Sequence, residues 1–236
     1  MTAIDRQRAF SGTKEVAAAL VLDATRLEAY LAANVKGFDG PLTIKQFKGG
    51  QSNPTYLLDT PARRYVLRRK PPGKLLPSAH AVDREFRVIE ALHRQNFPVA
   101  EPIHFCGDET IAGTAFYVMG FVDGRVFWEP PMPGSNAGDR AAIYDPMNEP
   151  LARLHTFDPA HIGLSDFGKG ENYVARQVER WSKQYRASET EKIDEMERLI
   201  EWLPKHIPPS GAPRLVHGDY RLDNLIIARD GPNILA

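Results

Sequence analysis

The sequence predicts an α+β fold in two parts, a five-stranded antiparallel sheet with one inserted helix followed by a mostly helical second half. Three observations support this prediction. Short extended apolar segments, separated by turn residues, fill much of the first 119 residues. One stripe of apolar residues at helical spacing interrupts them after the third segment. From residue 151 onward, apolar residues recur mostly at the helical period.

The first half begins with a helix from Asp23 to about Val35, because Asp23 is a good N-cap and Gly37 ends the pattern. Its stripe consists of Leu27, Tyr30, Leu31 and Asn34. A second helix is expected from Ser78 to about Gln95. The five strands are expected at residues 42–47, 55–58, 65–68, 103–106 and 114–119. The Gly-Phe-Val-Asp-Gly segment at 120–124 is expected to be a hinge between lobes at 1–119 and 125–236.

Three helices are expected in the second half, at residues 151–157, 172–186 and 188–203. Ser188 and Glu191 have the spacing of a capping box for the third of them. Strand-like segments follow at 215–216 and 225–227, and a turn at 229–232 leads into a returning strand. Trp181 is expected to pack between helices.

Composition excludes several classes of protein. The chain has 236 residues, of which 42% are hydrophobic, so it can bury a core. Its 30 basic and 30 acidic residues cancel, which gives no support for nucleic acid or an anionic membrane as a partner. No apolar run reaches the roughly 20 residues needed to span a bilayer, and the first ten residues do not resemble a signal peptide. The single cysteine, Cys106, is expected to be a packing residue in a cytoplasmic protein.

The stretch His217-Gly-Asp-Tyr-Arg-Leu-Asp-Asn224 lies between two strand-like segments and carries the densest polar motif. Its pattern matches the H-x-D-x-x-x-x-N catalytic loop of kinases. In that chemistry Asp219 would orient or deprotonate an acceptor hydroxyl, and the amide oxygen of Asn224 would bind Mg²⁺. His217 is expected to brace the loop by hydrogen bonds. The alternative is that Asp219 and Asn224 only form turns and caps.

The segment LVHGDYRLDNLI resembles the signature of the aminoglycoside phosphotransferase family, whose fold is like that of protein kinases. Other segments resemble a subgroup of kinase-like domains that are fused to acyl-CoA dehydrogenases or encoded beside them. These are GGQSNPTYLL, YVLRRKPPGKLLPSAHAVDREF, FYVMGFVDGR, LARLH and RQVERW. The resemblance extends over nearly the whole chain from about residue 40. It implies a two-lobed kinase-like fold with an N-terminal nucleotide-binding lobe.

The resemblance implies roles for several residues of the first lobe. Gly49, Gly50 and Ser52 would form a glycine-rich turn over the phosphates of ATP, although such a pair of glycines can also be a simple hairpin turn. Arg68 stands where kinases place a lysine, and an arginine can also hold phosphate. The alternative for Arg68 is a solvated charge.

Glu85 lies along the apolar face of its helix, where an unpaired carboxylate is costly. The resemblance pairs Glu85 with Arg68; the alternative is that Glu85 reaches water at the edge of the stripe. Met119 to Phe121 would hydrogen-bond adenine through the backbone. Gly120 departs from relatives that have an acidic residue there, which leaves backbone contacts intact.

The resemblance also implies an Asp on the strand that returns after the catalytic loop, as a second ligand of Mg²⁺. The returning strand starts at Asn233, and no Asp stands at the required place before Ala236. We therefore expect the chain to be incomplete at its C-terminal lobe and inactive as given. The rival interpretation is a natural pseudoenzyme.

Together these features predict an ATP- and Mg²⁺-dependent phosphotransferase that acts on a hydroxyl of a small molecule. The subgroup points to a hydroxyacyl-CoA rather than an aminoglycoside as acceptor, and to association with an acyl-CoA dehydrogenase. The basic run from Arg63 to Lys74 would suit an anionic cofactor tail, but a solvated surface explains it equally well. The alternative function is a nucleotide-binding module without turnover.

Overall fold

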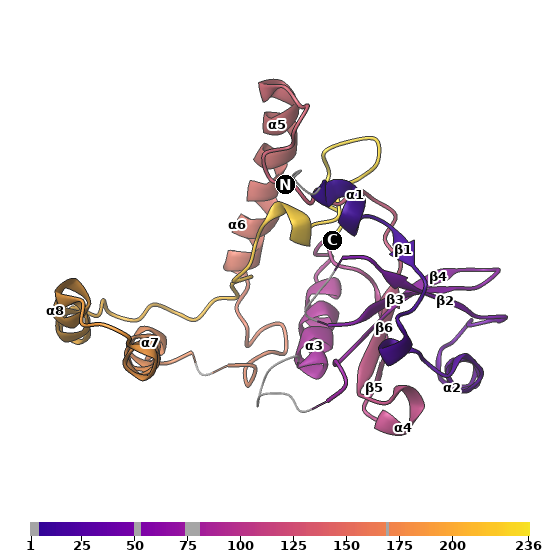
Figure 1. The fold of residues 1–236 in the computed structure, drawn as a ribbon, viewed down its shortest axis with the longest axis horizontal. Coiled ribbons are helices and arrows are strands. Elements are labelled where there is room, and N and C mark those ends of the chain that lie inside the picture. The colour runs from indigo at the N-terminus through magenta and orange to yellow at the C-terminus, as the bar shows by residue number, and fades with distance from the viewer. Residues whose placement is uncertain (1–4, 50–52, 74–80, 169) are drawn as a thin grey trace. The chain divides into compact units, whose positions relative to one another are not determined.

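The computed structural model describes residues 5–49, 53–73, 81–168 and 170–236. The chain divides into two compact units. The first comprises Met1–Leu154 together with His217–Ala236, and the second comprises His155–Val216. Figure 1 shows the elements of both units.

An antiparallel sheet of six strands forms the centre of the first unit, in the order β1-β2-β3-β4-β6-β5 (Figure 1). The strands are β1 Thr13–Lys14, β2 Thr43–Phe47, β3 Thr55–Asp59, β4 Arg64–Arg69, β5 Pro102–Cys106 and β6 Phe116–Gly120. The five predicted strands are all present, although β6 starts two residues later than expected. The prediction of five strands was wrong by one, because the two residues of β1 are too few to show an alternating pattern.

Helices accompany the sheet in the first unit. They are α1 Arg6–Phe10, α2 Ala24–Asn34, α3 Val82–His93, α4 Glu109–Ala112, α5 Ala137–Tyr144 and α6 Asn148–Thr156, with short 3₁₀ turns η1 Ala18–Leu20, η2 Asp145–Met147 and η4 Leu222–Asn224. Asp23 caps α2 as predicted, since its carboxylate accepts from the Arg26 N–H at 3.0 Å. The predicted start of the second helix at Ser78 lies outside the described residues.

The two faces of the sheet carry different partners, because successive side chains of a strand point to opposite faces. Phe116 and Val118 of β6 join α2 in one core cluster, in which Leu27 and Leu31 are fully buried. Tyr117 of β6 lies in a second cluster together with Val82, Phe86 and Ile89 of α3. Asn34, predicted on the stripe of α2, is exposed instead. Cys106 is buried in the first cluster, which confirms its packing role.

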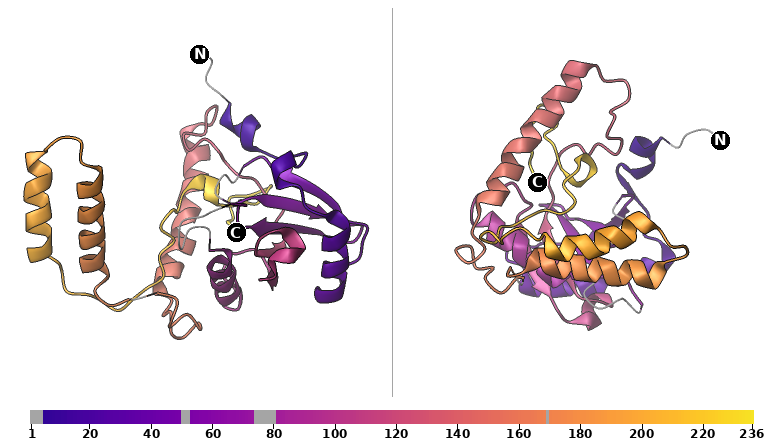
Figure 2. Two further views of the ribbon diagram at one scale, coloured as in Figure 1. Left: turned by 60° about the horizontal axis from the view of Figure 1, so that its bottom comes forward. Right: turned by 90° about the vertical axis from the view of Figure 1, so that its left-hand side faces the viewer.

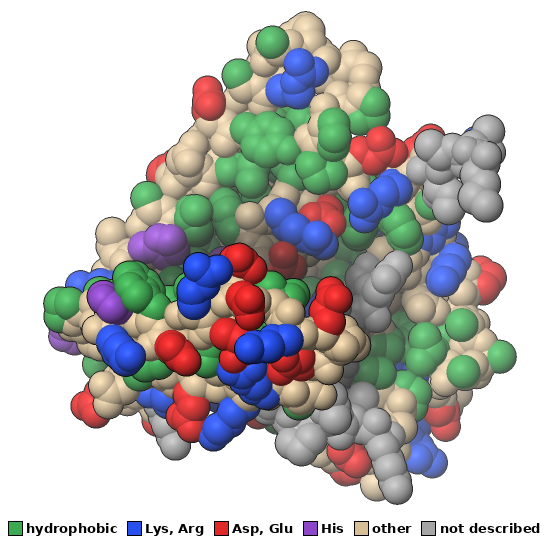
Figure 3. Space-filling view, turned by 60° about the vertical axis from the view of Figure 1, so that its left-hand side comes forward, with side chains coloured by type: hydrophobic (Ala, Val, Ile, Leu, Met, Phe, Trp, Pro, Cys, Tyr) green, Lys and Arg blue, Asp and Glu red, His purple; other side chains and the backbone are tan. Residues whose placement is uncertain are grey.

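The second unit contains α7 Tyr173–Ser188, α8 Asp194–Trp202 and the turn η3 Leu203–Lys205. Figure 2 shows α7 and α8 side by side and antiparallel. Charged side chains of both signs intermingle over them in Figure 3, and they form ion pairs such as Lys183–Glu179 and Arg198–Glu195. Arg186 of α7 binds Glu197 of α8 and so joins the two helices.

Three predictions for the second half were wrong. The capping box is absent because Ser188 ends α7, where its hydroxyl donates to the Gln184 carbonyl, and α8 begins only after Ile193. Trp181 is 53% exposed rather than packed between helices. Residues 215–216 form no strand, and the segment at 225–227 makes only isolated bridges, Arg125 to Ile227 and Ile227 to Ile234. Within the described residues, no helix is long and apolar enough to cross a membrane.

Arg69 of β4 is a buried cation, with only 4% of its surface exposed. Its guanidinium donates to the Leu20 carbonyl at 2.9 Å, to the Tyr56 hydroxyl at 3.0 Å and to the Ala112 carbonyl. These bonds connect β4 with the segment before α2, with β3 and with the end of α4. Arg69 therefore donates to three oxygen atoms inside the core, of which the Leu20 carbonyl also accepts from the Tyr56 hydroxyl at 2.9 Å.

We expect Arg69→Met to lower the free energy of unfolding by about 3 kcal/mol, because it leaves buried oxygens without a donor. The matched exchange Arg64→Met removes a half-exposed arginine from the same strand and should cost less than about 1 kcal/mol. Urea denaturation of both variants measures the difference. Equal losses would show that the buried guanidinium has no special structural role.

His104 on β5 gives a pH-dependent contribution to stability. Its Nε2 lies 2.9 Å from the Tyr30 hydroxyl, and burial lowers the pKa of His104. The folded state therefore disfavours the protonated ring, so stability decreases as the pH falls below the ordinary pKa of histidine, about 6.5. We expect the free energy of unfolding to fall less between pH 8 and pH 5 in His104→Gln than in the unmodified protein. If the free energy of unfolding changed equally with pH in the two proteins, His104 would not be the source of the pH dependence.

Candidate functional site

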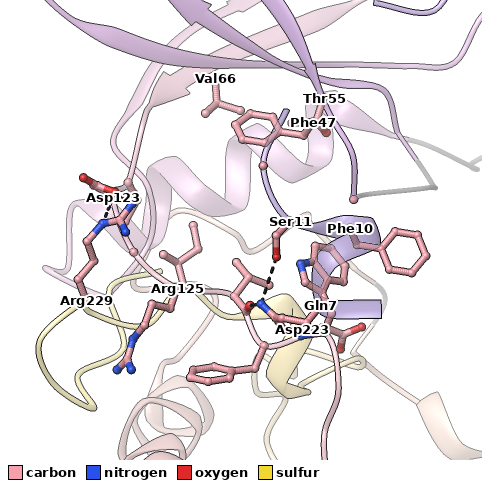
Figure 4. Close-up of a pocket in the computed structure, with 18 of the residues that line it drawn as sticks. Gln7, Phe10, Ser11, Phe47, Thr55, Val66, Asp123, Arg125, Asp223 and Arg229 are labelled. Atoms are coloured by element: carbon pink, nitrogen blue, oxygen red, sulfur yellow. Dashed lines mark hydrogen bonds and ion pairs between the residues drawn. The ribbon is translucent and has the colours of Figure 1, made fainter. Parts of the chain in front are cut away.

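A cavity of about 1110 Å³ opens in the first unit, beside the face of the sheet that carries α3. Figure 4 shows residues of its wall: Phe47, Thr55 and Val66 come from strands β2, β3 and β4, and Gln7, Phe10 and Ser11 from the N-terminal segment. Asp123, Arg125 and Arg229 lie on the opposite side of the view from Gln7 and Ser11. The cavity thus lies between the sheet, the segment after β6 and the C-terminal residues.

Part of the cavity is an apolar slot at the predicted hinge. Its walls include Val66, Ala100, Met119, Phe121 and Ile226. Apolar walls next to the edge of a backbone segment suit a flat heteroaromatic ring, which needs a few directed hydrogen bonds for orientation. The N–H of Phe121 already donates to the Arg64 carbonyl at 3.3 Å, so a ring in this slot would use other backbone groups of the segment.

Glu85 of α3 is the centre of a hydrogen-bonded group, of which Arg68 lines the cavity. Its Oε2 accepts from Arg68 Nε at 2.9 Å and from the Tyr117 hydroxyl at 3.2 Å, and its Oε1 accepts from the Asn53 amide at 3.0 Å. The proximity of Arg68 and Glu85 is as the resemblance implied. Burial, reinforced by the Glu85 charge, raises the pKa of Tyr117. The carboxylate therefore holds Arg68 in a fixed orientation, and Arg68 lines the cavity.

The glycine-rich turn is described only at its first residue. Gly49 lines the cavity, whereas Gly50 and Ser52 lie outside the described residues. The indole of Trp128 packs on Gly49, so closely that a Cβ at position 49 would lie 2.1 Å from Trp128 Cη2. A larger residue at position 49 would therefore have to displace the indole of Trp128.

The predicted catalytic loop forms a turn that ends in η4. Gly218 has a φ of 79°, a left-handed conformation that favours glycine. Asn224 Nδ2 donates to the Asp219 carbonyl at 3.0 Å and to Asp219 Oδ2 at 2.8 Å. The N–H of Asp219 donates to His217 Nδ1 at 3.3 Å, so the ring braces the loop as predicted. Loss of hydration lowers the pKa of His217, and the Asp219 charge opposes this shift.

The loop is anchored on both sides. The Tyr220 hydroxyl donates to the Met147 carbonyl at 2.7 Å. After the loop, Arg125 and Ile227 exchange backbone hydrogen bonds of 2.6 and 2.9 Å. The Arg125 guanidinium also donates to the carbonyls of Ala228 and Gly231. The position of Asp219 is therefore set by the segment after β6 as well as by its own turn.

Two residues of the loop were missed by sequence reasoning. Arg221 bridges two carboxylates, since its Nε lies 3.3 Å from Asp219 Oδ1 and its Nη2 lies 2.9 Å from Asp223 Oδ2. Asp223 lines the cavity, and its side chain is only 6% exposed. Its Oδ1 is buried without a hydrogen-bond partner among the described residues. Both residues lie inside the motif at 217–224, and the density of charged residues in that motif is the sequence feature that could have identified them.

The predicted residues are distributed unequally around the cavity. Gly49, Arg68, Met119 and Phe121 line it, and Glu85 lies behind Arg68. The loop of His217, Asp219 and Asn224 reaches the wall through Asp223. Asn53 was also missed; it is 1% exposed and holds Glu85 from the side of β3. No sequence pattern distinguished Asn53 from an ordinary turn residue.

The donor set is compatible with a hard cation but does not form a closed site. Because the Asn224 amide nitrogen binds Asp219, its carbonyl oxygen is the end that a cation could bind. Carboxylate and carboxamide oxygens are ligands that Mg²⁺ prefers. Across the described ranges, however, no group of three or more His, Cys, Asp or Glu residues could hold a metal.

Comparison with known proteins gives a consistent result. The family model of the phosphotransferase enzyme family matches residues 43–236. Mouse acyl-CoA dehydrogenase family member 10 is 45% identical over 225 residues, which cover 95% of this chain and 21% of that protein. Mouse acyl-CoA dehydrogenase family member 11 is 45% identical over 221 residues, 92% of this chain and 28% of that protein. The chain thus spans about a quarter of the length of these curated relatives.

Two solved structures show the same fold. A Ralstonia eutropha protein provisionally named an aminoglycoside phosphotransferase has a TM-score of 0.80 at 49% identity, covering 92% of this chain and 64% of that one. An aminoglycoside phosphotransferase in a ternary complex with streptomycin and ATP has a TM-score of 0.59 at 18% identity, covering 91% and 69%. The second likeness concerns the fold alone. Together they confirm the predicted α+β, kinase-like fold.

We expect Glu85→Ala to lower the free energy of unfolding by about 2 kcal/mol, because Asn53, Arg68 and Tyr117 lose their common acceptor. Asp83→Ala removes an exposed carboxylate from the same helix and should change stability by less than about 0.5 kcal/mol. Urea denaturation compares the two. Glu85→Gln, which keeps the acceptor oxygen, should fall between them; a loss no larger than that of Asp83→Ala would contradict the central role of Glu85.

Proposed function

This chain belongs to the phosphotransferase enzyme family, and from that premise we propose that it transfers the γ-phosphoryl group of ATP to a hydroxyl of a small molecule. One observation carries the proposal. The wall of one cavity includes the apolar slot, the guanidinium of Arg68 held by Glu85, and Asp223 from the loop that carries Asp219 and Asn224. These are the parts that phosphoryl transfer needs for positioning.

The adenine of ATP is assigned to the slot between Val66 and Ile226, with the triphosphate extending toward Arg68. The guanidinium offers donors in a planar fork that matches phosphate oxygens. Glu85 engages its Nε at 2.9 Å, which fixes the plane of the fork. Arg68 would therefore hold phosphate as a pre-oriented group and lose little side-chain entropy on binding.

Asp219 is assigned as the residue that orients the acceptor hydroxyl and accepts its proton as the oxygen attacks the γ-phosphorus and the bond to the β-phosphate oxygen breaks. Its side chain is 67% exposed, so an acceptor can approach it. Asn224 and Arg221 hold the two carboxylate oxygens at 2.8 and 3.3 Å. His217 acts indirectly, because it accepts the N–H of Asp219 and fixes the turn.

Mg²⁺ is proposed as the cofactor, with the Asn224 carbonyl oxygen as a ligand. When bound, the ion would neutralise charge on the phosphate oxygens. The second ligand implied by family resemblance, an Asp on the strand that starts at Asn233, stays a prediction, as does the division of the chain at residues 120–124 into two lobes.

A hydroxyacyl-CoA is the proposed acceptor, and an acyl-CoA dehydrogenase the proposed partner. The names of the relatives from mouse support the link to an acyl-CoA dehydrogenase, and the hydroxyacyl-CoA acceptor stays a prediction. The basic run gives it no further support. Arg63 is paired with Glu101, Arg64 with Asp123, and Arg69 is buried in the core. Most of this run is therefore occupied by structural contacts, so an anionic cofactor tail must find its partners elsewhere.

The test is phosphate transfer from γ-labelled ATP to a hydroxyacyl-CoA and to an aminoglycoside, measured on the full-length gene product with and without Mg²⁺. We expect Asp219→Asn to lower the turnover number at least about 100-fold, because the proton acceptor is lost, while ATP affinity by calorimetry stays within about threefold. Asp230→Asn, which changes an exposed carboxylate in the hairpin turn, is the matched control and should keep full activity.

ATP binding without transfer to either acceptor would favour a nucleotide-binding module without turnover. Absence of ATP binding would exclude both functions.

A further inference from the structure

Asp223 of η4 carries a carboxylate of which one oxygen is paired and the other has no partner among the described residues. Its side chain lines the cavity and is only 6% exposed (Figure 4). Oδ2 lies 2.9 Å from Arg221 Nη2, whereas Oδ1 is buried without a hydrogen bond. A buried carboxylate oxygen without a donor is costly. The wall of the cavity therefore contains an acceptor whose missing donor a bound ligand can supply.

The other carboxylates in the described part of the cavity wall do not share this feature. Asp123 has guanidinium groups on both oxygens, since Arg229 Nε lies 2.8 Å from Oδ1 and Arg64 Nη2 lies 3.6 Å from Oδ2. Glu129 and Asp5 accept backbone N–H groups at 3.0 and 2.9 Å, and neither has a buried oxygen without a partner in the described structure. The unpartnered oxygen thus marks one point of the wall.

The position of this oxygen is fixed by neighbouring residues. Leu222 and Leu225, which flank Asp223 and Asn224, are 1% and 4% exposed and belong to one core cluster. The Asn224 N–H donates to the Arg221 carbonyl at 2.9 Å and closes the turn. Because the Arg221 guanidinium also holds Oδ2, rotation of the carboxylate is restricted. Oδ1 is therefore an acceptor that is oriented before a ligand binds, which reduces the entropy lost on binding.

The place of Asp223 in the chain relates it to one part of a bound nucleotide. Three residues later, Ile226 belongs to the wall of the apolar slot that is assigned to adenine. Four residues earlier, Asp219 is assigned to the acceptor hydroxyl, where the triphosphate must end. The ribose is the part of ATP that joins the adenine to the triphosphate. A cavity residue between the slot and Asp219 is therefore suited to contact the sugar.

The chemistry of ATP supports the same assignment. Its phosphate oxygens are anionic, so a carboxylate would repel them, and they are assigned to Arg68. The hydrogen-bond donors of ATP are the amino group of adenine and the hydroxyl groups of the ribose. The amino group is part of the ring that occupies the slot, which leaves the ribose hydroxyls as partners for Asp223. A carboxylate that accepts from a ribose hydroxyl is a known means of recognising this sugar.

We propose that Asp223 recognises the ribose of the bound nucleotide, with Oδ1 accepting a hydrogen bond from one of the sugar hydroxyls. The inference rests on the proposed function, since it assumes ATP in this cavity. Asp223 would thereby select ribonucleotides over deoxyribonucleotides without taking part in phosphoryl transfer. Arg221 joins this residue to the reaction, because its Nε lies 3.3 Å from Asp219 Oδ1.

The experiment compares the affinities of the full-length gene product for ATP, 2′-deoxy-ATP and 3′-deoxy-ATP by calorimetry, with Mg²⁺ and with EDTA. We expect one of the deoxy analogues to bind roughly 10-fold more weakly than ATP, because a hydrogen bond to a charged group is lost. In Asp223→Ala the ratio of the two affinities should fall to about one. Glu129→Ala removes another carboxylate from the wall and is the matched control, which should keep the ratio.

The affinity ratio is a readout that a purely structural role would not move. A variant that only loosens the loop weakens ATP and its deoxy analogues alike, and thermal unfolding without nucleotide reports that loss separately. Asp223→Asn serves as the test if Asp223→Ala does not fold. Its amide oxygen can stay with Arg221, which turns the amide nitrogen toward the sugar, so this variant should also lower the ratio.

Three results would overturn the ribose contact alone. In the first, both deoxy analogues bind as tightly as ATP. In the second, the ratio persists in Asp223→Ala. In the third, Asp223→Ala weakens all three nucleotides equally and only with Mg²⁺, which would assign Asp223 to the metal. Failure of the unmodified protein to bind ATP would overturn the ribose contact together with the proposed function.

Discussion

The carboxylate of Glu85 is the contact on which the organisation of the site depends. It is bonded to Asn53 beside β3, to Arg68 on β4 and to Tyr117 on β6, while it is itself carried by α3. One side chain therefore fixes the helix against three parts of the sheet. The same bonds orient the arginine that faces the cavity, so the packing of α3 and the geometry of the proposed phosphate site are determined together.

Sequence patterns were sufficient where the structure follows from local periodicity. The five longer strands, the cap of α2 by Asp23 and the burial of Cys106 all depend on residues close in the chain or on general preferences for burial. The capping box at Ser188 failed because α7 continued through that residue, and tertiary context decides such boundaries. β1 was missed because its two residues pair with β2 across a long sequence separation.

The same distinction applies to the site. The pairing of Arg68 with Glu85 was predicted because the family resemblance implied that these two residues lie close together, which the sequence alone does not show. The loop was predicted because its motif is contiguous in the sequence. No such pattern marks Asn53, Trp128 or the N-terminal segment. The hydrogen bond of 2.9 Å between the Trp128 N–H and Gln7, for example, joins two residues that are 121 positions apart in the sequence. Arg221 and Asp223 stood inside the motif, but only their three-dimensional arrangement shows that one guanidinium serves two carboxylates.

The adjacent arginines of β4 have opposite environments, because alternation turns Arg68 toward the cavity and Arg69 into the core. Inherited changes at these neighbouring codons should therefore have different cellular consequences. Loss of Arg69 would reduce the amount of protein that survives quality control. Loss of Arg68 would remove one hydrogen bond to Glu85 and, in addition, the guanidinium that lines the cavity, which is the proposed phosphate contact. Surveys of natural variation that score abundance alone would then underestimate the second kind of change.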